Sequence, residues 1–236
     1  MYPDESIQGI IDPHPWWETY QGDDYKRGCL VWAFLPHVDQ TPFTLIPVGR
    51  EEPTIHDKAT VQIQPLNIRQ VIRYPHLPVA ALPQRHDEIR AVYLAKKRPA
   101  LIISKGGPRV RKSLTKGKAK WQTYPTMIVA PYYGADEGGS RGGFNPQFLK
   151  RVRLCEYPQF MWDKLPISGR STVESILRFD HMQPVGRSQD SIAFTDYCLS
   201  ERALRLIDEW VTWLITGFLD ESTKLREIRD VLLDIS

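Results

Sequence analysis

The residues of this sequence best suited to chemistry lie at positions 96–104, where three cations stand directly before an apolar run. Pro99 lacks a backbone N–H and suits the first residue of a strand, and the β-branched Ile102 and Ile103 favour the strand that follows. Arg98 would then be held at the mouth of this strand, where its planar guanidinium can bind two oxygens of a phosphate or carboxylate. The alternative is a charge that only protects an edge strand from aggregation.

A second feature is the basic segment that follows, here residues 105–120. Residues 96–120 hold ten lysines and arginines and no acidic residue, and glycines at 106, 107 and 117 predict an exposed loop. An acid-free run favours an anionic partner, either nucleic acid or an acidic protein segment, over a merely solvated loop. The candidate anion-binding residues are Lys97, Lys105, Arg109, Arg111, Lys112 and Lys116, with Trp121 as a candidate stacking platform for a nucleobase.

Three tryptophans are candidates for binding a protein partner. Trp16 and Trp17 lie among prolines in an N-terminal arm without a regular period. Each buried indole N–H needs an acceptor, so this pair either packs on its own domain or anchors another protein. Trp213 lies partly off the apolar stripe of a predicted helix at residues 199–219, so that helix could be covered on a second side.

The elements that must position these residues are mainly strands. Apolar, β-branched or alternating runs predict strands at residues 26–35, 43–46, 59–63, 99–104, 124–131, 148–156 and 175–185. The second and third of these flank a turn-rich stretch and predict an inserted β-hairpin. Near the end the apolar period changes to that of a helix, which predicts helices at about residues 199–219 and 221–233.

Composition and cysteine usage indicate the class of protein. A chain of 236 residues with 42% hydrophobic content can bury a substantial core as one domain. Cys29, Cys155 and Cys198 are odd in number and widely spaced, which indicates a reducing cytoplasm, no disulfide framework and no metal site. No apolar run reaches the ~18 residues of a membrane span, and residues 1–5 do not resemble a signal peptide, so we expect a cytoplasmic protein without a membrane segment.

The order of these pieces resembles the MazF/PemK endoribonuclease toxins. Residues 27–31 are similar to the opening strand of that family, 97–104 to its Arg-Pro-led second strand, 129–131 to the strand before its active-site threonine, and 175–185 to its Ser-x-x-x-x-Asp-Gln segment. His181 stands in the place of that Gln. The likeness covers roughly residues 26–219 in outline, and the segments 97–104 and 175–185 are its most specific parts.

The resemblance implies a fold and its divisions. It implies a mainly β protein with an SH3-like small β-barrel, here carrying the inserted hairpin and C-terminal helices. Residues 1–25 would form an aromatic, proline-rich arm, 26–220 the barrel with an insertion at about 39–90, and 221–236 a helical tail. The family also implies a homodimer.

The resemblance also implies a site. In that family the arginine before the proline steadies the phosphate while the RNA 2′-hydroxyl attacks it, a threonine helps to hold the reacting group, and neither metal nor cofactor takes part. Arg98 maps onto this arginine. Tyr132 or Tyr133 occupies the place of the threonine, and Cys29 replaces an acidic residue of the first strand. A tyrosine hydroxyl beside Arg98 can act as a donor or weak acid, so Tyr133 is the second candidate catalytic residue of an active enzyme.

Two functional hypotheses follow. The first is a derived, non-catalytic MazF-like protein that binds protein partners as an accessory or regulatory subunit of a prokaryotic toxin–antitoxin, CRISPR-associated or other defence complex. The second is an active, metal-independent endoribonuclease that cleaves single-stranded RNA, for which Arg98 and the basic segment are the main support. Neither hypothesis requires a cofactor.

Overall fold

The computed structural model divides the chain into two compact units, one formed by Met1–Phe34 with Lys97–Ser236 and the other by Leu35–Lys96. It describes residues 2–11, 13–22, 24–50, 52, 54–55, 58–69, 88–135, 143–167, 174–187 and 190–235. Within these residues, no helix combines the length and the apolar composition needed to cross a membrane.

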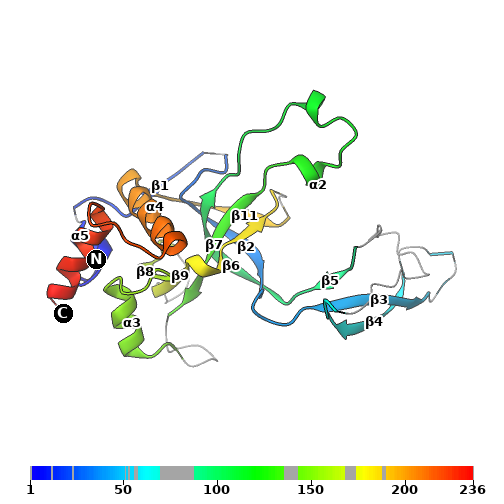
Figure 1. Ribbon diagram of the computed structural model, residues 1–236, viewed down its shortest axis with the longest axis horizontal. Coiled ribbons are helices and arrows are strands. Elements are labelled where there is room, and N and C mark those ends of the chain that lie inside the picture. The colour runs from blue at the N-terminus through cyan, green and yellow to red at the C-terminus, as the bar shows by residue number, and fades with distance from the viewer. Residues whose placement is uncertain are drawn as a thin grey trace. The chain divides into compact units, whose positions relative to one another are not determined.

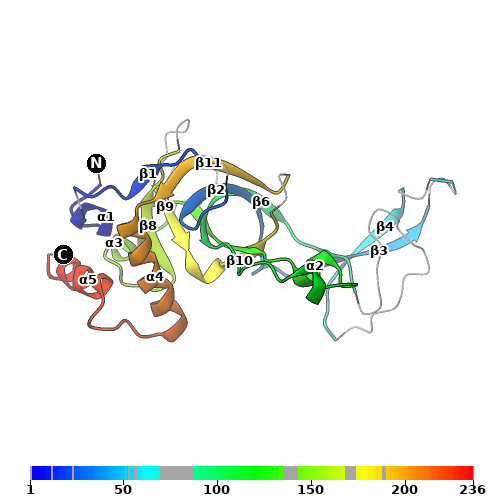
Figure 2. The ribbon, with the colours of Figure 1, turned by 90° about the horizontal axis from the view of Figure 1, so that it is seen from above.

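The larger unit is built on an eight-stranded sheet (Figure 1). Its strands are β1 (Trp17–Thr19), β2 (Cys29–Pro36), β6 (Ala95–Ser104), β7 (Met127–Gly134), β8 (Phe160–Lys164), β9 (Glu174–Arg178), β10 (Gln183–Val185) and β11 (Ile192–Leu199). They follow the order β1-β11-β2-β6-β7-β9-β8, and β10 pairs with β7. The sheet is strongly curled into an antiparallel half-barrel, as Figure 2 shows, so the predicted mainly β class with some helices is confirmed.

The larger unit also contains helices, most of which pack on this sheet or on one another. They are α1 (Ile7–Ile10), α2 (Lys120–Thr123), α3 (Pro146–Arg153), α4 (Glu201–Thr216) and α5 (Lys224–Asp234), with 3-10 turns η1 (Lys112–Leu114) and η2 (Phe179–His181). The two helices predicted near the end of the chain are confirmed as α4 and α5. The Ser200 hydroxyl accepts from the N–H of Ala203 to start α4, and Gly217, with φ 70°, ends it.

The main core lies between one face of the sheet and α4 and α5. Trp210 of α4 is fully buried, stacks on Phe179 at 5.8 Å, and donates its indole N–H to the carbonyl of Pro158. Trp213 is only 8% exposed and belongs to the same cluster. Its side chain therefore packs inside its own domain and presents little surface to a partner.

The described part of the smaller unit forms a three-stranded sheet in the order β4-β3-β5. Its strands are β3 (Phe43–Gly49), β4 (Thr60–Pro65) and β5 (Ala91–Val92). β3 and β4 form an antiparallel hairpin in which Leu45 faces Ile63, at the position where the hairpin was predicted. The apolar side chains of β4 are largely exposed, with Ile63 at 60%.

The prediction of a strand at residues 148–156 is wrong, because the first part of this stretch belongs to α3. Asn145 accepts from the N–H of Gln147, and Pro146 occupies the first turn, where its missing N–H costs nothing. The apolar Leu149 and Val152 are three residues apart, which suits one face of a helix.

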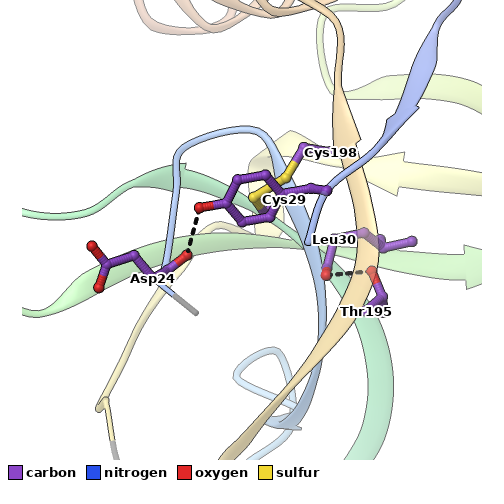
Figure 3. Close-up of a disulfide and its surroundings, with 6 residues drawn as sticks. Asp24, Cys29, Leu30, Thr195 and Cys198 are labelled. Carbon is purple, nitrogen blue, oxygen red and sulfur yellow. Dashed lines mark hydrogen bonds between the residues drawn. A yellow bond between two sulfur atoms is a disulfide. The ribbon is translucent and has the colours of Figure 1, made fainter. Parts of the chain in front are cut away.

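The prediction that no disulfide forms is also wrong. Cys29 of β2 and Cys198 of β11 are register partners on neighbouring strands, and their sulfurs are bonded (Figure 3). The two cysteines are 169 residues apart in the sequence, so only the strand pairing reveals their contact. Cys155 is a buried free thiol, and burial raises its pKa to about 12, which makes it unreactive.

Candidate active site

Arg98 and Tyr133 lie opposite one another on β6 and β7. The register pairs Ala100 with Pro131 and Leu101 with Ala130, and its continuation by two residues sets Arg98 across from Tyr133. The guanidinium carbon of Arg98 is 4.1 Å from the centroid of the Tyr133 ring, a close cation–π contact. Both residues are half-buried. The structure thus brings together the two candidate catalytic residues.

His181 joins this pair from η2, the turn between β9 and β10. The Tyr133 hydroxyl oxygen is 2.8 Å from His181 Nδ1, and the two rings meet edge to face. The other ring nitrogen of His181, Nε2, is 2.7 Å from Nη2 of Arg178 at the end of β9. His181 therefore bridges the tyrosine hydroxyl and a second arginine.

These two contacts select the tautomer of the neutral His181 ring. A guanidinium has only N–H donors, so Nε2 of His181 must accept from Arg178. The neutral imidazole then carries its proton on Nδ1, and that N–H donates to the Tyr133 hydroxyl oxygen. The Tyr133 hydroxyl oxygen is then the acceptor in this contact, so its hydrogen points away from His181. This arrangement makes Tyr133 a proton donor whose oxygen is already stabilised by an N–H.

Arg178 is itself fixed by Asp180. Two hydrogen bonds of 2.7 Å join its Nε and Nη2 to the carboxylate oxygens of Asp180. Partial burial raises the pKa of Asp180, but the hydrogen bonds and charge of Arg178 outweigh it, so the net pKa lies below the usual value. The guanidinium carbon of Arg178 also lies 4.8 Å from the Phe160 ring and 5.8 Å from that of Tyr133. Asp180 thus keeps its charge and orients Arg178 toward the cluster.

Tyr132 occupies the opposite face of the sheet and is not part of this cluster. It is 1% exposed, and its hydroxyl donates to Asp163 of β8 at 3.0 Å. Burial, together with the charge of Asp163, raises the pKa of Tyr132 well above its usual value. Of these two neighbouring tyrosines, Tyr133 is the one whose ring lies against the guanidinium of Arg98. Because successive side chains of a strand point to opposite faces of the sheet, the two tyrosines have different surroundings.

Asp163 is a fully buried carboxylate that organises the N-terminal arm. It accepts hydrogen bonds from the indole N–H groups of Trp16 and Trp17, at 3.2 and 3.4 Å, and from the hydroxyls of Tyr2 and Tyr132. Burial raises the pKa of Asp163 to about 7, although these hydrogen bonds oppose the shift. Trp16 and Trp17 therefore pack on their own domain, which is the intramolecular alternative for this pair.

The described part of the basic segment lies on the surface. Lys105, Arg109, Arg111, Lys112 and Lys116 are exposed, and none of the five forms an ion pair with another described residue. Arg109 lies over the ring of Tyr124 at 4.5 Å, and Lys97 lies over that of Trp32 at 5.7 Å. The side chain of Trp121 lies outside the described residues. The segment presents a positive, aromatic-bearing surface of the kind that suits a nucleic-acid backbone.

Sequence reasoning did not single out Arg178, and it favoured a structural pairing of His181 with Asp180 over a role for the histidine as a general base. All three come from the stretch 175–185 that resembles the toxin family, so their short spacing was the available signal. Their meeting with Tyr133 depends on β9 pairing with β7, where Tyr133 faces Ile176. That pairing joins segments far apart in the sequence.

As assembled, this cluster can bind an anion and transfer a proton. The guanidiniums of Arg98 and Arg178 lie 4.1 and 5.8 Å from the ring of Tyr133, and the hydroxyl of that tyrosine is hydrogen-bonded to His181. Such preorganised charge and donors suit a phosphate on which negative charge develops. No protein-family model, curated protein or solved structure matches this chain.

Proposed function

We propose that the larger unit is a MazF/PemK-like, SH3-like small barrel that binds single-stranded RNA and cleaves it without a metal ion. The observation that carries this proposal is the contact of Arg98 with Tyr133, whose hydroxyl is hydrogen-bonded to His181. It supplies a phosphate-binding group and a proton donor in one place. The exposed basic segment between β6 and β7 supports an RNA substrate.

The chemistry is an internal transesterification. The RNA 2′-oxygen bonds to phosphorus while the bond from phosphorus to the 5′-oxygen breaks, leaving a 2′,3′-cyclic phosphate and a 5′-hydroxyl. Arg98 and Arg178 stabilise the negative charge that gathers on the phosphate oxygens. Water takes the proton of the 2′-hydroxyl, and Tyr133 donates its own to the departing 5′-oxygen. The Nδ1–H of His181 stabilises the tyrosinate as it forms, and solvent reprotonates it afterwards.

A second function has its own supporting observation. The exposed apolar side chains of β4, Val61 at 42% and Ile63 at 60%, give the smaller unit a surface suited to a protein partner. On this proposal the chain is a non-catalytic subunit of a prokaryotic defence complex. It requires no RNA cleavage, so the two functions can be separated by experiment.

The test is a cleavage assay of the full chain on a long mixed-sequence RNA, with EDTA present. We expect fragments that end in 2′,3′-cyclic phosphate from the wild type, and none from Arg98→Ala. Arg226→Ala, which removes a guanidinium from the surface of α5, serves as the matched control and should cleave normally. Intact RNA after incubation with wild-type protein would overturn the enzyme and favour the protein-binding function.

A cytoplasmic location is part of this proposal, because that is where an RNA substrate for such an enzyme is found. The disulfide between Cys29 and Cys198 bears on it directly. Disulfides are rare in a reducing cytoplasm and are there mostly transient or redox-sensing. The proposal therefore includes a dithiol form of the protein that retains the sheet.

A further inference from the structure

We propose that the junction of α4 and α5 is a second binding site, which takes the phosphate monoester of a small organic molecule. A cavity of about 330 Å³ lies there, lined by Arg202, Arg205, Leu206, Glu209 and Lys224. The two helices are neighbours in the larger unit (Figure 1). None of these residues belongs to the candidate active site, and the inference does not depend on the proposed ribonuclease activity.

Two arginines provide the recognition. Arg202 and Arg205 are three residues apart on α4, so they project from the same face on consecutive turns. Neither side chain forms a hydrogen bond or an ion pair with any residue that the structure describes, although Glu209 follows Arg205 at the i+4 position of the helix. Each guanidinium presents a fork of donors that matches two oxygens of one anion. The pair is therefore available to a ligand.

Glu209 forms no ion pair with either arginine in the described part of the chain, and its carboxylate instead holds α5 in place. Its Oε2 accepts the backbone N–H of Leu225 at 2.6 Å, in the first turn of α5. Lys224 contributes a third cation at the rim, where its Nζ also contacts Glu227. Because Lys224 is paired with Glu227, the net positive charge of the lining comes from the two arginines set against the one carboxylate of Glu209.

The remaining lining residue suggests the kind of molecule that carries the phosphate. Leu206 is 2% exposed and forms an apolar floor beside the charged side chains. The cavity volume lies near the lower end of the roughly 300–1,000 Å³ typical of small-molecule sites. A phosphate monoester fits this lining, since it offers three terminal oxygens to the cations and an organic body to the floor. Adenosine monophosphate (AMP) is a suitable probe.

The experiment is isothermal titration calorimetry of the full chain with AMP in a phosphate-free buffer, with adenosine and inorganic phosphate as comparison ligands. We expect AMP to bind, adenosine not to bind, and inorganic phosphate to bind more weakly than AMP. The double variant Arg202→Ala/Arg205→Ala should weaken AMP binding by about 10-fold or more. Arg226→Ala, on the same pair of helices but outside the cavity, should bind as the wild type does. No AMP binding by the wild type, or unchanged affinity in the double variant, would overturn the site.

Two further measurements separate recognition from folding. Arg202→Lys/Arg205→Lys keeps both charges but removes the guanidinium forks, so its affinity should lie between those of the wild type and the alanine variant. RNA cleavage by the alanine variant should equal that of the wild type, which keeps failure of this site distinct from failure of the proposed function. Displacement of AMP by a 5′-phosphorylated RNA oligonucleotide, but not by its 5′-hydroxyl form, would identify RNA ends as the natural source of the phosphate.

Discussion

The guanidinium of Arg98 lies over the ring of Tyr133 at 4.1 Å, and these residues come from adjacent strands of a curled sheet. The contact holds a flexible arginine side chain beside a hydroxyl group, where both can meet one phosphate. Because Pro99 follows Arg98 within β6, the backbone at this point is restricted as well. The conformational entropy of the Arg98 side chain is therefore lost on folding and not on ligand binding.

Tyr133→Phe tests the role of this hydroxyl while keeping the ring that Arg98 covers. We expect RNA affinity to stay within about twofold, since the cation–π contact and both arginines remain. The cleavage rate should fall by about 10²–10⁴-fold, the usual contribution of a positioned acid. Fluorescence anisotropy measures binding, and fragment formation over time measures cleavage.

The matched control for that variant is Tyr93→Phe, because Tyr93 is an exposed tyrosine of the smaller unit. Removing the hydroxyl group of Tyr93 should change neither the RNA affinity nor the cleavage rate. Full cleavage activity in Tyr133→Phe would exclude Tyr133 as the proton donor, whereas equal loss of binding and cleavage would give it a role in RNA binding instead.

Asp163→Asn is expected to remove a pH dependence of stability. Burial raises the pKa of Asp163 from 3.8 to about 7, so the folded state holds this proton more tightly than the unfolded state. Its stabilising contribution is complete below about pH 4 and is lost as the pH rises to about 7. Asparagine does not titrate. The free energy of unfolding of the wild type should therefore fall relative to the variant across this range, by up to about 4 kcal/mol.

Urea denaturation of both proteins at about pH 4.5 and about pH 7.5 measures this difference. The variant should be less stable than the wild type at the lower pH, because its amide donors face other donors in the buried cluster. The difference in the free energy of unfolding between the two proteins should be smaller at the higher pH. If the difference in the free energy of unfolding is the same at both pH values, Asp163 is ionised at both.

Local signals in the sequence were enough for the helices at the end of the chain. Ser200 at the start of α4 and the apolar stripe that includes Leu206 and Trp210 act within a few turns, so they could be identified without knowing the fold. Arg98 was found in the same way, from Pro99 and the strand that follows. The prediction for residues 148–156 failed because their alternating charges suggested a strand, whereas Asn145 and Pro146 start a helix just before them.

Long-range pairings account for what the sequence could not show. The bond between Cys29 and Cys198 depends on β2 lying beside β11. The choice of Tyr133 over Tyr132 depends on the register of β6 with β7, which places Tyr133 on the same face of the sheet as Arg98. The buried acceptor for Trp16 and Trp17 is Asp163, a single acid in a distant strand. No local pattern distinguishes this residue from a surface aspartate.

Reduction of the Cys29–Cys198 disulfide should destabilise the larger unit without dismantling it. The bond closes a long loop, and removing such a bond typically costs about 2–5 kcal/mol. The strand pairing of β2 with β11 and β6 remains to support the sheet. Thermal melts with and without a phosphine reductant should show a lower midpoint in the reduced protein. Cys29→Ser/Cys198→Ser should melt at that lower temperature under both conditions.

Cys155→Ser is the control for that experiment, because Cys155 is a buried thiol without a disulfide partner. Its melting temperature should respond to the reductant as the wild type does. A wild-type melting temperature that is insensitive to the reductant would show that the two cysteines are not bonded in solution.

Removal of charge from the basic segment should weaken RNA binding in a salt-dependent way. Arg111, Lys112 and Lys116 are exposed and form no ion pair with other described residues, so their replacement by alanine leaves no partner charge behind. If each contacts a phosphate of single-stranded RNA, the triple variant should reduce the slope of log affinity against log salt by about 2. Anisotropy titrations at salt concentrations between about 50 and 200 mM give this slope. An unchanged slope with the same affinity would place the RNA elsewhere and confine the ribonuclease proposal to the Arg98–Tyr133 site.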